Sequence, residues 1–84
     1  MVKIVMKRVD SSQIRSVGYD PQKNILYIEF TNGTVYKYID VPIGDFNALC
    51  MLTMSVGKYF YAEIKGKYEY EKLDVLVREG EIEV

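Results

Sequence analysis

Three tyrosines and two basic residues have the types and the spacing of a surface that binds planar, negatively charged molecules. Tyr36 and Tyr38 alternate along one apolar segment and Tyr27 lies in the segment before it, so strand pairing would gather the three rings on one sheet face. Aromatic rings on an open sheet stack on nucleic-acid bases, and each stacked base contributes about 1–3 kcal/mol. Arg15 and Lys23 lie near enough in the predicted sheet to contact phosphates. The pattern therefore indicates a candidate RNA-binding face.

A purely structural role is the competing interpretation of the same three tyrosines. Tyrosine is common in strands, forms cross-strand aromatic pairs and is frequently half-buried. In that case the rings pack beneath the C-terminal segment or against a second copy of the chain, and the protein is an interaction module or a homodimer. The two interpretations differ in whether the rings face solvent in the folded monomer.

A second group of candidate binding residues follows in the C-terminal half. Ser55 can begin a helix, and exposed backbone amides there together with Lys58 would attract a phosphate. Lys58, Lys65 and Lys67 would then form a basic patch. The glycine-rich signature of nucleotide-binding phosphate loops is absent. The alternative is that Ser55 caps the helix, Gly57 allows close packing, and the lysines lie on a solvated face.

The composition excludes most catalytic machinery. The 84 residues contain no His and one Cys, which excludes His-dependent triads, multi-cysteine metal sites and an internal disulfide. Cys50 lies among apolar neighbours and is expected to be buried. Turn or capping positions account for four of the carboxylates, Asp10, Asp20, Asp40 and Asp45. We therefore expect a non-enzymatic binding module without a metal or cofactor.

Charge is divided unevenly along the chain. Residues 1–68 carry nine basic and six acidic side chains, whereas residues 69–84 carry two basic and six acidic ones. The acidic tail is expected to lie across the basic body and to compete with RNA. Apolar stretches are much shorter than the roughly 18 residues of a membrane span, and the start of the chain lacks a secretory cleavage pattern. With a lone thiol, these features predict a cytoplasmic protein without a membrane partner.

Alternating apolar residues predict strands over residues 2–6, 14–19, 25–30 and 35–39. Asn32-Gly33 predicts a two-residue hairpin turn, and Pro21 a turn with three central residues. The first turn pairs Phe30 with Val35, Ile28 with Lys37, Leu26 with Ile39, Glu29 with Tyr36 and Tyr27 with Tyr38. The second turn pairs Ile14 with Phe30, Arg15 with Glu29 and Val17 with Tyr27.

Helical spacing takes over after Pro42, which suits a first helical position. Apolar residues recur at that spacing from Ile43 to Thr53, and Phe60 and Ile64 lie one turn apart in a second short helix that Gly66 ends. Residues 68–70 have the alternation of a strand, and residues 73–78 and 81–84 can form a hairpin around Glu79-Gly80. The expected fold is α+β, a small antiparallel sheet of about four to six strands with two short helices packed on one face.

The order of the motifs resembles that of the KTSC domain family, which is named for its occurrence at the C-terminus of some lysyl-tRNA synthetases. The motifs are Ser11-Ser12-x-Ile14, Gly18-Tyr19-Asp20, Leu26-x-Ile28-x-Phe30, Asn32-Gly33, Tyr36-x-Tyr38, Val41-Pro42, Ser55-x-Gly57-x-Tyr59-Phe60 and Ile64-Lys65. The resemblance implies RNA binding, with tRNA as the candidate RNA, and supplies no catalytic residue. It divides the chain into a KTSC-like domain over residues 1–70 and an acidic extension over 71–84, expected as a strand or hairpin packed on the same domain.

Overall fold

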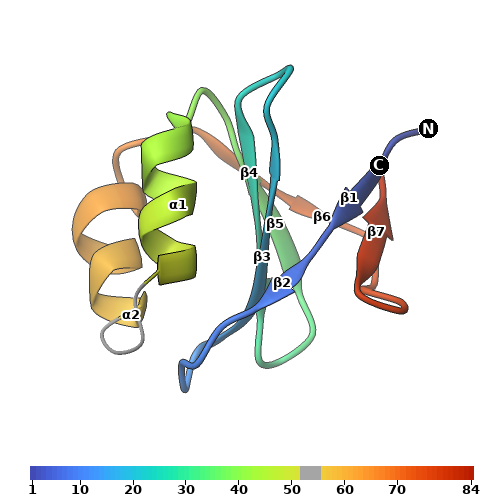
Figure 1. Ribbon diagram of the computed structural model, residues 1–84, viewed down its shortest axis with the longest axis horizontal. Coiled ribbons are helices and arrows are strands. Elements are labelled where there is room, and N and C mark those ends of the chain that lie inside the picture. The colour runs from blue at the N-terminus through green and yellow to red at the C-terminus, as the bar shows by residue number, and fades with distance from the viewer. Residues whose placement is uncertain (52–55) are drawn as a thin grey trace.

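The computed structural model describes residues 1–51 and 56–84, which form two antiparallel sheets and one layer of helices (Figure 1). The elements in chain order are β1 (Lys3–Val5), β2 (Lys7–Arg8), β3 (Ile14–Asp20), β4 (Ile25–Phe30), β5 (Val35–Tyr38), α1 (Ile43–Met51), α2 (Val56–Tyr59), the π-helix η1 (Phe60–Ile64), β6 (Tyr70–Leu73) and β7 (Glu81–Glu83). The predicted α+β class, with the helices on one face of a small antiparallel sheet, is confirmed.

The larger sheet separates two hydrophobic layers. Its strand order is β2-β3-β4-β5-β6, and the helices cover one of its faces. A two-stranded sheet of β1 and β7 lies on the other face and brings the two chain ends side by side (Figure 1). Each terminal strand donates one hydrogen bond to the other, between Val2 and Val84, with N···O distances of 2.8 Å. Both faces of the larger sheet are therefore partly covered by protein.

The core on the helix side is the larger of the two. Its buried residues come from β3, β4, β5 and the helices, and they include Ile14, Leu26, Leu49, Phe60 and Ile64. The core on the β1–β7 side is made by five buried residues, Ile4, Met6, Tyr27, Val35 and Ile82. Ile82 is only 2% exposed, so the C-terminal strand is part of the folded body.

Gly18 permits the chain to cross over itself where β1 passes β3. A Cβ atom at this position would lie 2.8 Å from Ile4 Cγ2 and 2.9 Å from the Val5 carbonyl oxygen. Real Cβ contacts are essentially never that short, so only glycine lets the N-terminal strand pack this closely on β3. This crossing explains why glycine is needed in the Gly18-Tyr19-Asp20 motif.

The hairpin between β4 and β5 differs from the prediction by one residue. Phe30 N–H donates to Thr34 O and Gly33 N–H donates to Phe30 O, both at 2.9 Å, and Gly33 has a φ of +91°. The turn therefore has three central residues, with glycine in the left-handed region. The observed pairs are Leu26 with Tyr38, Tyr27 with Lys37, Ile28 with Tyr36 and Glu29 with Val35. The predicted register is wrong.

The pairing between β3 and β4 is partly as predicted. Ile14 lies opposite Phe30 as expected, but the register shifts between Ile14 and Ser16, leaving Arg15 as the extra residue of a bulge. Ser16 then faces Glu29, and Val17 faces Ile28, so the predicted pairs of Arg15 with Glu29 and Val17 with Tyr27 are wrong. The expected charges nevertheless meet, because Arg15 Nη1 lies 3.7 Å from Glu29 Oε2.

The helical segments agree with the sequence pattern except at one turn. Helix α1 follows Pro42 as predicted, while the positions of Thr53 and the predicted cap Ser55 lie outside the described residues. Phe60 and Ile64 are buried as expected, but they belong to a π-helical turn that the Lys65 N–H closes on the Phe60 carbonyl at 2.8 Å. Gly66, with a φ of +85°, ends the segment.

The C-terminal segment contributes to both sheets. Strand β6 pairs with β5, and β7 pairs with β1 instead of with residues 73–78. The predicted turn at Glu79-Gly80 is present, with both residues at positive φ, but it closes a single bridge between Arg78 and Glu81. The tail is therefore packed on the same domain as strands, although not as the predicted hairpin of residues 73–78 and 81–84. No helix within residues 1–51 or 56–84 has the length and apolarity needed to cross a membrane.

Candidate nucleic-acid interface

The observed hairpin register builds an aromatic groove between η1 and the β5–β6 side of the larger sheet. The groove has a volume of about 660 Å³. Its aromatic residues are Phe30, Tyr36, Tyr38, Phe60, Tyr61 and Tyr70. Because directly paired residues share a face, Tyr36 and Tyr38 lie on the helix side with Leu26 and Ile28. The groove exists only because the rings of β5 point toward the helices.

The rings divide into a buried floor and open walls. Tyr38 is 4% exposed and packs edge-on against Phe60, with 5.5 Å between ring centroids. Tyr70 leans over the floor at 5.9 Å from Tyr36 and 5.8 Å from Tyr38, measured between centroids. Tyr61 and Tyr70 are 50% and 62% exposed. These two rings are the most exposed aromatic residues of the groove and are therefore its candidates for stacking on a planar ligand.

Positive charge lies directly beside the open rings. Lys65 Nζ sits 4.6 Å from the ring centroid of Tyr61, within the range of a cation–π contact. Tyr61 and Lys65 are four residues apart on the exposed side of the π-helical turn, whereas Phe60 and Ile64 are buried. Lys72 of β6 is the cross-strand partner of Tyr36 and therefore shares the groove face. The groove thus combines exposed rings with the ammonium group of Lys65, and Lys72 lies on the same face of the sheet.

Polar groups line the end of the groove near the β4–β5 turn. Asn32 Oδ1 accepts hydrogen bonds from Thr34 N–H at 3.0 Å and Thr34 Oγ1 at 2.7 Å. This commits the oxygen of the amide to the turn and points to its NH₂ group as the end available to a ligand. Arg15 Nη2 donates to the Thr31 carbonyl at 2.7 Å, which places a guanidinium beside this end.

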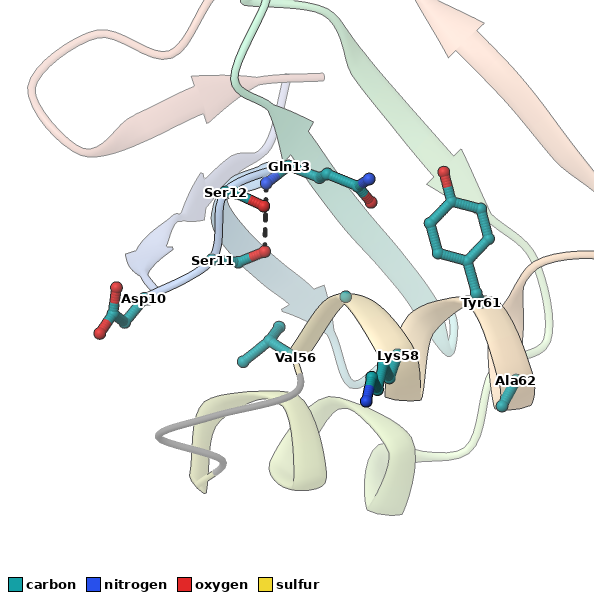
Figure 2. A pocket seen from close by; sticks show the side chains of 9 residues that line it. Asp10, Ser11, Ser12, Gln13, Val56, Lys58, Tyr61 and Ala62 are labelled. Carbon is teal, nitrogen blue, oxygen red and sulfur yellow. Dashed lines mark hydrogen bonds between the residues drawn. The ribbon is translucent and has the colours of Figure 1, made fainter.

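A second hollow continues the groove beyond Gln13 and Tyr61, which line both (Figure 2). This serine-loop hollow, of about 640 Å³, lies between residues 10–13 and residues 56–62. Ser11 Oγ accepts the N–H groups of Gln13 and Ile14 at 3.2 and 3.3 Å, which fixes the turn of the loop itself. In Figure 2 the Gln13 side chain extends toward Tyr61. The two hollows are adjacent, since they share Gln13 and Tyr61, and together they are called the trough.

Four of the eight predicted site residues lie along this trough. Tyr36, Tyr38 and Lys65 line the aromatic groove, and Lys58 lines the serine-loop hollow. Tyr27 lies on the opposite face, where it is 3% exposed in the second core and burial raises the pKa of its hydroxyl. The prediction that three tyrosines share one face is therefore wrong, because the turn is one residue longer than expected.

The other three predicted residues have separate surroundings. Arg15 lies at the end of the groove but is engaged by Glu29 and by the Thr31 carbonyl. Lys67 Nζ pairs with Glu63 Oε2 at 3.1 Å. Lys23 lies in the β3–β4 turn and lines a different hollow.

Sequence analysis missed the two most exposed rings of the groove. Tyr61 has the spacing of a solvated helix face, and Tyr70 was placed at the start of the acidic tail. The sequence signal for these two rings is weak. Tyr61 follows the buried Phe60 by one residue, and Tyr70 stands in a short alternating run. A five-residue helical turn and an extra sheet strand are what bring them together.

A polar contact network fixes the helical wall of the groove. Asp45, in the first turn of α1, accepts hydrogen bonds from Tyr59 Oη at 2.7 Å and from Tyr68 Oη at 3.1 Å. The first of these bonds raises the pKa of Tyr59 to about 12. Asp45 thus ties α1 to the residues on both sides of η1. Burial also raises the pKa of Tyr38 to about 12, so both hydroxyls are neutral donors at physiological pH.

The remaining chemistry-bearing residues have structural positions. Burial raises the pKa of the Cys50 thiol, which disfavours the nucleophilic thiolate. Asp20 accepts the N–H of Gln22 at 2.9 Å, the turn role predicted for it. Across residues 1–51 and 56–84, no group of three or more His, Cys, Asp or Glu side chains is arranged to hold a metal ion.

Comparison with known proteins indicates the same family as the order of the motifs in the sequence. A family model described as KTSC domain matches residues 10–68. An uncharacterized protein of Stutzerimonas stutzeri is 42% identical over 72 residues, covering 82% of this chain and the whole of that protein. A lysine–tRNA ligase of a Nostoc species is 32% identical over 73 residues, which are 87% of this chain and 13% of the ligase.

A solved structure shows the same architecture. The crystal structure of a KTSC domain protein from Yersinia pestis superposes with a TM-score of 0.78 at 34% sequence identity. The match covers 83% of this chain and 97% of the other. The sequence and structural comparisons together show that this chain belongs to the KTSC domain family.

Proposed function

We propose that this protein is a small non-enzymatic RNA-binding module that holds unpaired bases in its aromatic groove. The observation that carries the proposal is the pair of exposed rings, Tyr61 and Tyr70, facing a groove that Lys65 also lines. A similar segment occurs in relatives named lysine–tRNA ligase, which makes tRNA the first RNA to test. A cytoplasmic location is part of the same proposal.

The groove chemistry favours single-stranded over double-stranded RNA. Bases inside a duplex present only their edges, whereas bases in loops and ends expose faces that stack on aromatic side chains. Tyr61 and Tyr70 supply such stacking faces, and Lys58, Lys65 and Lys72 supply charge for the neighbouring phosphates. The amide of Asn32 adds a donor for a base edge at one end. An unpaired loop or end of tRNA is the expected substrate.

The proposal is tested by truncating the two exposed rings. We expect Tyr61→Ala and Tyr70→Ala each to weaken binding of a single-stranded tetranucleotide by about 5- to 150-fold, the range that one lost stacking contact predicts. Tyr70→Phe is the matched control, because it keeps the ring and should bind within about twofold of the parent. Fluorescence anisotropy at low salt gives the affinities.

Stability measurements accompany the titrations, since an unfolded variant would lose binding for a trivial reason. Both alanine variants should keep the thermal midpoint of the parent within a few degrees, because each removed ring is at least half exposed. Folded variants that bind the tetranucleotide as tightly as the parent would contradict the proposal.

A second copy of the chain is the alternative occupant of the groove. The same exposed Tyr61 and Tyr70, with the unpaired edge of β6 beside them among the described strands, would suit a homodimer. Mass measurement across a wide concentration range decides this, since the alternative predicts a dimer that Tyr70→Ala weakens. A monomer at every concentration counts against it and leaves the groove open to RNA.

A further inference from the structure

A basic hollow lies on the opposite flank of the helix layer from the aromatic groove. It has a volume of about 540 Å³ and is lined by Lys3 of β1, Lys7 of β2, Lys23 of the β3–β4 turn, and the rings of Tyr19 and Phe46. In the larger sheet β2 is one edge and β6 the other, so this hollow and the groove flank opposite ends of the strand order.

The crossing of β1 over β3 directs the lysines into this hollow. Ile4 and Met6 are buried, so the alternating residues Lys3 and Lys7 point away from the second core. Gly18 makes the crossing possible by leaving no Cβ between the segments. Three ammonium groups from three separate elements therefore meet at one surface.

Little negative charge opposes these lysines inside the hollow. Asp20 is the acidic residue of the lining, but it is 7% exposed and its Oδ1 accepts the N–H groups of Gln22 and Lys23 at 2.9 and 3.3 Å. Glu83 is the cross-strand neighbour of Lys3, so Lys3 contributes less free charge than Lys7 and Lys23. The hollow is positive overall and suits an anionic ligand.

The aromatic pair in this hollow is committed to structure. Tyr19 and Phe46 stack with 5.4 Å between centroids, and Tyr19 Oη donates to the Val41 carbonyl at 2.6 Å. Each ring thus already has a parallel stacking partner, whereas Tyr61 and Tyr70 are at least half exposed. The hollow therefore favours contact with phosphates over stacking of bases.

We infer that Lys3, Lys7 and Lys23 bind phosphates of the same RNA strand whose bases occupy the aromatic groove. The inference rests on the proposed RNA binding but assigns a separate surface to it. The longest dimension of the molecule is 31 Å, and a stacked strand rises about 3.4 Å per nucleotide, so about nine nucleotides are needed to reach both surfaces. Affinity should therefore rise with RNA length.

The test compares two triple variants on two RNA lengths. Lys3→Gln/Lys7→Gln/Lys23→Gln removes the charges of the hollow, and Arg8→Gln/Lys67→Gln/Arg78→Gln removes three exposed charges elsewhere. Each is titrated with the tetranucleotide and with an unstructured RNA of about 24 nucleotides at salt concentrations between about 50 and 200 mM.

We expect the hollow variant to bind the longer RNA about tenfold more weakly at low salt, with a slope of log affinity against log salt reduced by about 2. Its affinity for the tetranucleotide should change less than twofold. The inference is overturned if the matched control loses as much affinity as the hollow variant, or if neither variant changes the slope.

The outcomes separate this inference from the proposed groove. Suppose that the hollow variant shows a smaller salt slope for the long RNA but the parent does not bind the tetranucleotide. That result supports the hollow as a phosphate site and overturns the groove. If the parent binds the tetranucleotide and the hollow variant keeps the parent's salt slope for the long RNA, the groove is supported and the hollow is overturned. Absence of binding to either RNA by the parent protein overturns both.

Discussion

The two faces of the larger sheet use tyrosine in opposite ways. On the β1–β7 side, Tyr27 is 3% exposed and fills the second core together with Val35 and Ile82. On the helix side, Tyr70 is 62% exposed and overhangs a groove whose floor is Tyr38. The two faces differ in how completely a second layer covers them.

The difference shows that coverage, and not residue type, decides which tyrosines are accessible to solvent. The strands β1 and β7 seal Tyr27 beneath them, whereas the helices stop short of β6 and leave the groove open. The chain ends therefore matter as much as the helices, because β1 and β7 cover Tyr27 on one face of the sheet and leave the groove on the other face as the candidate site.

Removal of β7 is the largest change that this comparison predicts. Deleting residues 79–84 should unfold the protein, because it uncovers Ile4, Met6, Tyr27 and Val35, each worth roughly 1.5–3 kcal/mol when buried. The sum is comparable with the whole stability of a small domain, about 5–15 kcal/mol. Circular dichroism during thermal unfolding measures the effect. A folded variant with an unchanged midpoint would show that the terminal strands are an appendage.

Paired alanine substitutions on the two faces should have opposite consequences. Tyr27→Ala should lower the free energy of unfolding by about 3–5 kcal/mol, as expected when a buried aromatic ring leaves a cavity. Tyr70→Ala should lower it by less than about 1 kcal/mol while weakening RNA binding. Denaturant titration of both variants checks the stability values. Equal losses of stability would mean that Tyr70 belongs to the core and not to a binding surface.

Local patterns in the sequence were enough to place the strands and the helices but not to align them. Strand β4 was predicted at its observed bounds, and its pairing of Ile14 with Phe30 is correct. Its residues are nevertheless apolar on both faces, since both faces are covered, so alternation does not specify which face is which. Asn32-Gly33 fits a two-residue or a three-residue turn, and that single residue decides where Tyr36 points.

The parts of the site that sequence reasoning missed depend on long-range geometry. Tyr61 and Lys65 are four residues apart, a spacing that any helical turn brings together, but the spacing does not show that this turn borders a groove. Tyr70 joins the groove because β6 pairs with β5. Tyr36 and Tyr38 line the groove, but the prediction that they share a sheet face with Tyr27 is wrong.

A smaller change in stability than that of Tyr27→Ala is expected from removing the hydrogen bond between Tyr59 and Asp45, which fixes the helical wall of the groove. Tyr59→Phe removes the donor to Asp45 Oδ1 and should lower the free energy of unfolding by about 1–2 kcal/mol at neutral pH. Because the folded pKa of Tyr59 is raised from 10.0 to about 12, the bond stabilises the protein fully below pH 10 and is lost as pH rises toward 12. The parent should therefore lose more stability than Tyr59→Phe across that interval.

The measurement is urea unfolding of both proteins at several pH values, with Tyr61→Phe as the control for removing an exposed hydroxyl. The control should follow the parent, since the ring of Tyr61 is 50% exposed. Parallel curves for the parent and Tyr59→Phe would show that the bond to Asp45 does not stabilise the fold. Asp45 would then not fix the wall of the groove, and Tyr61 would owe its position to the burial of Phe60 and Ile64 alone.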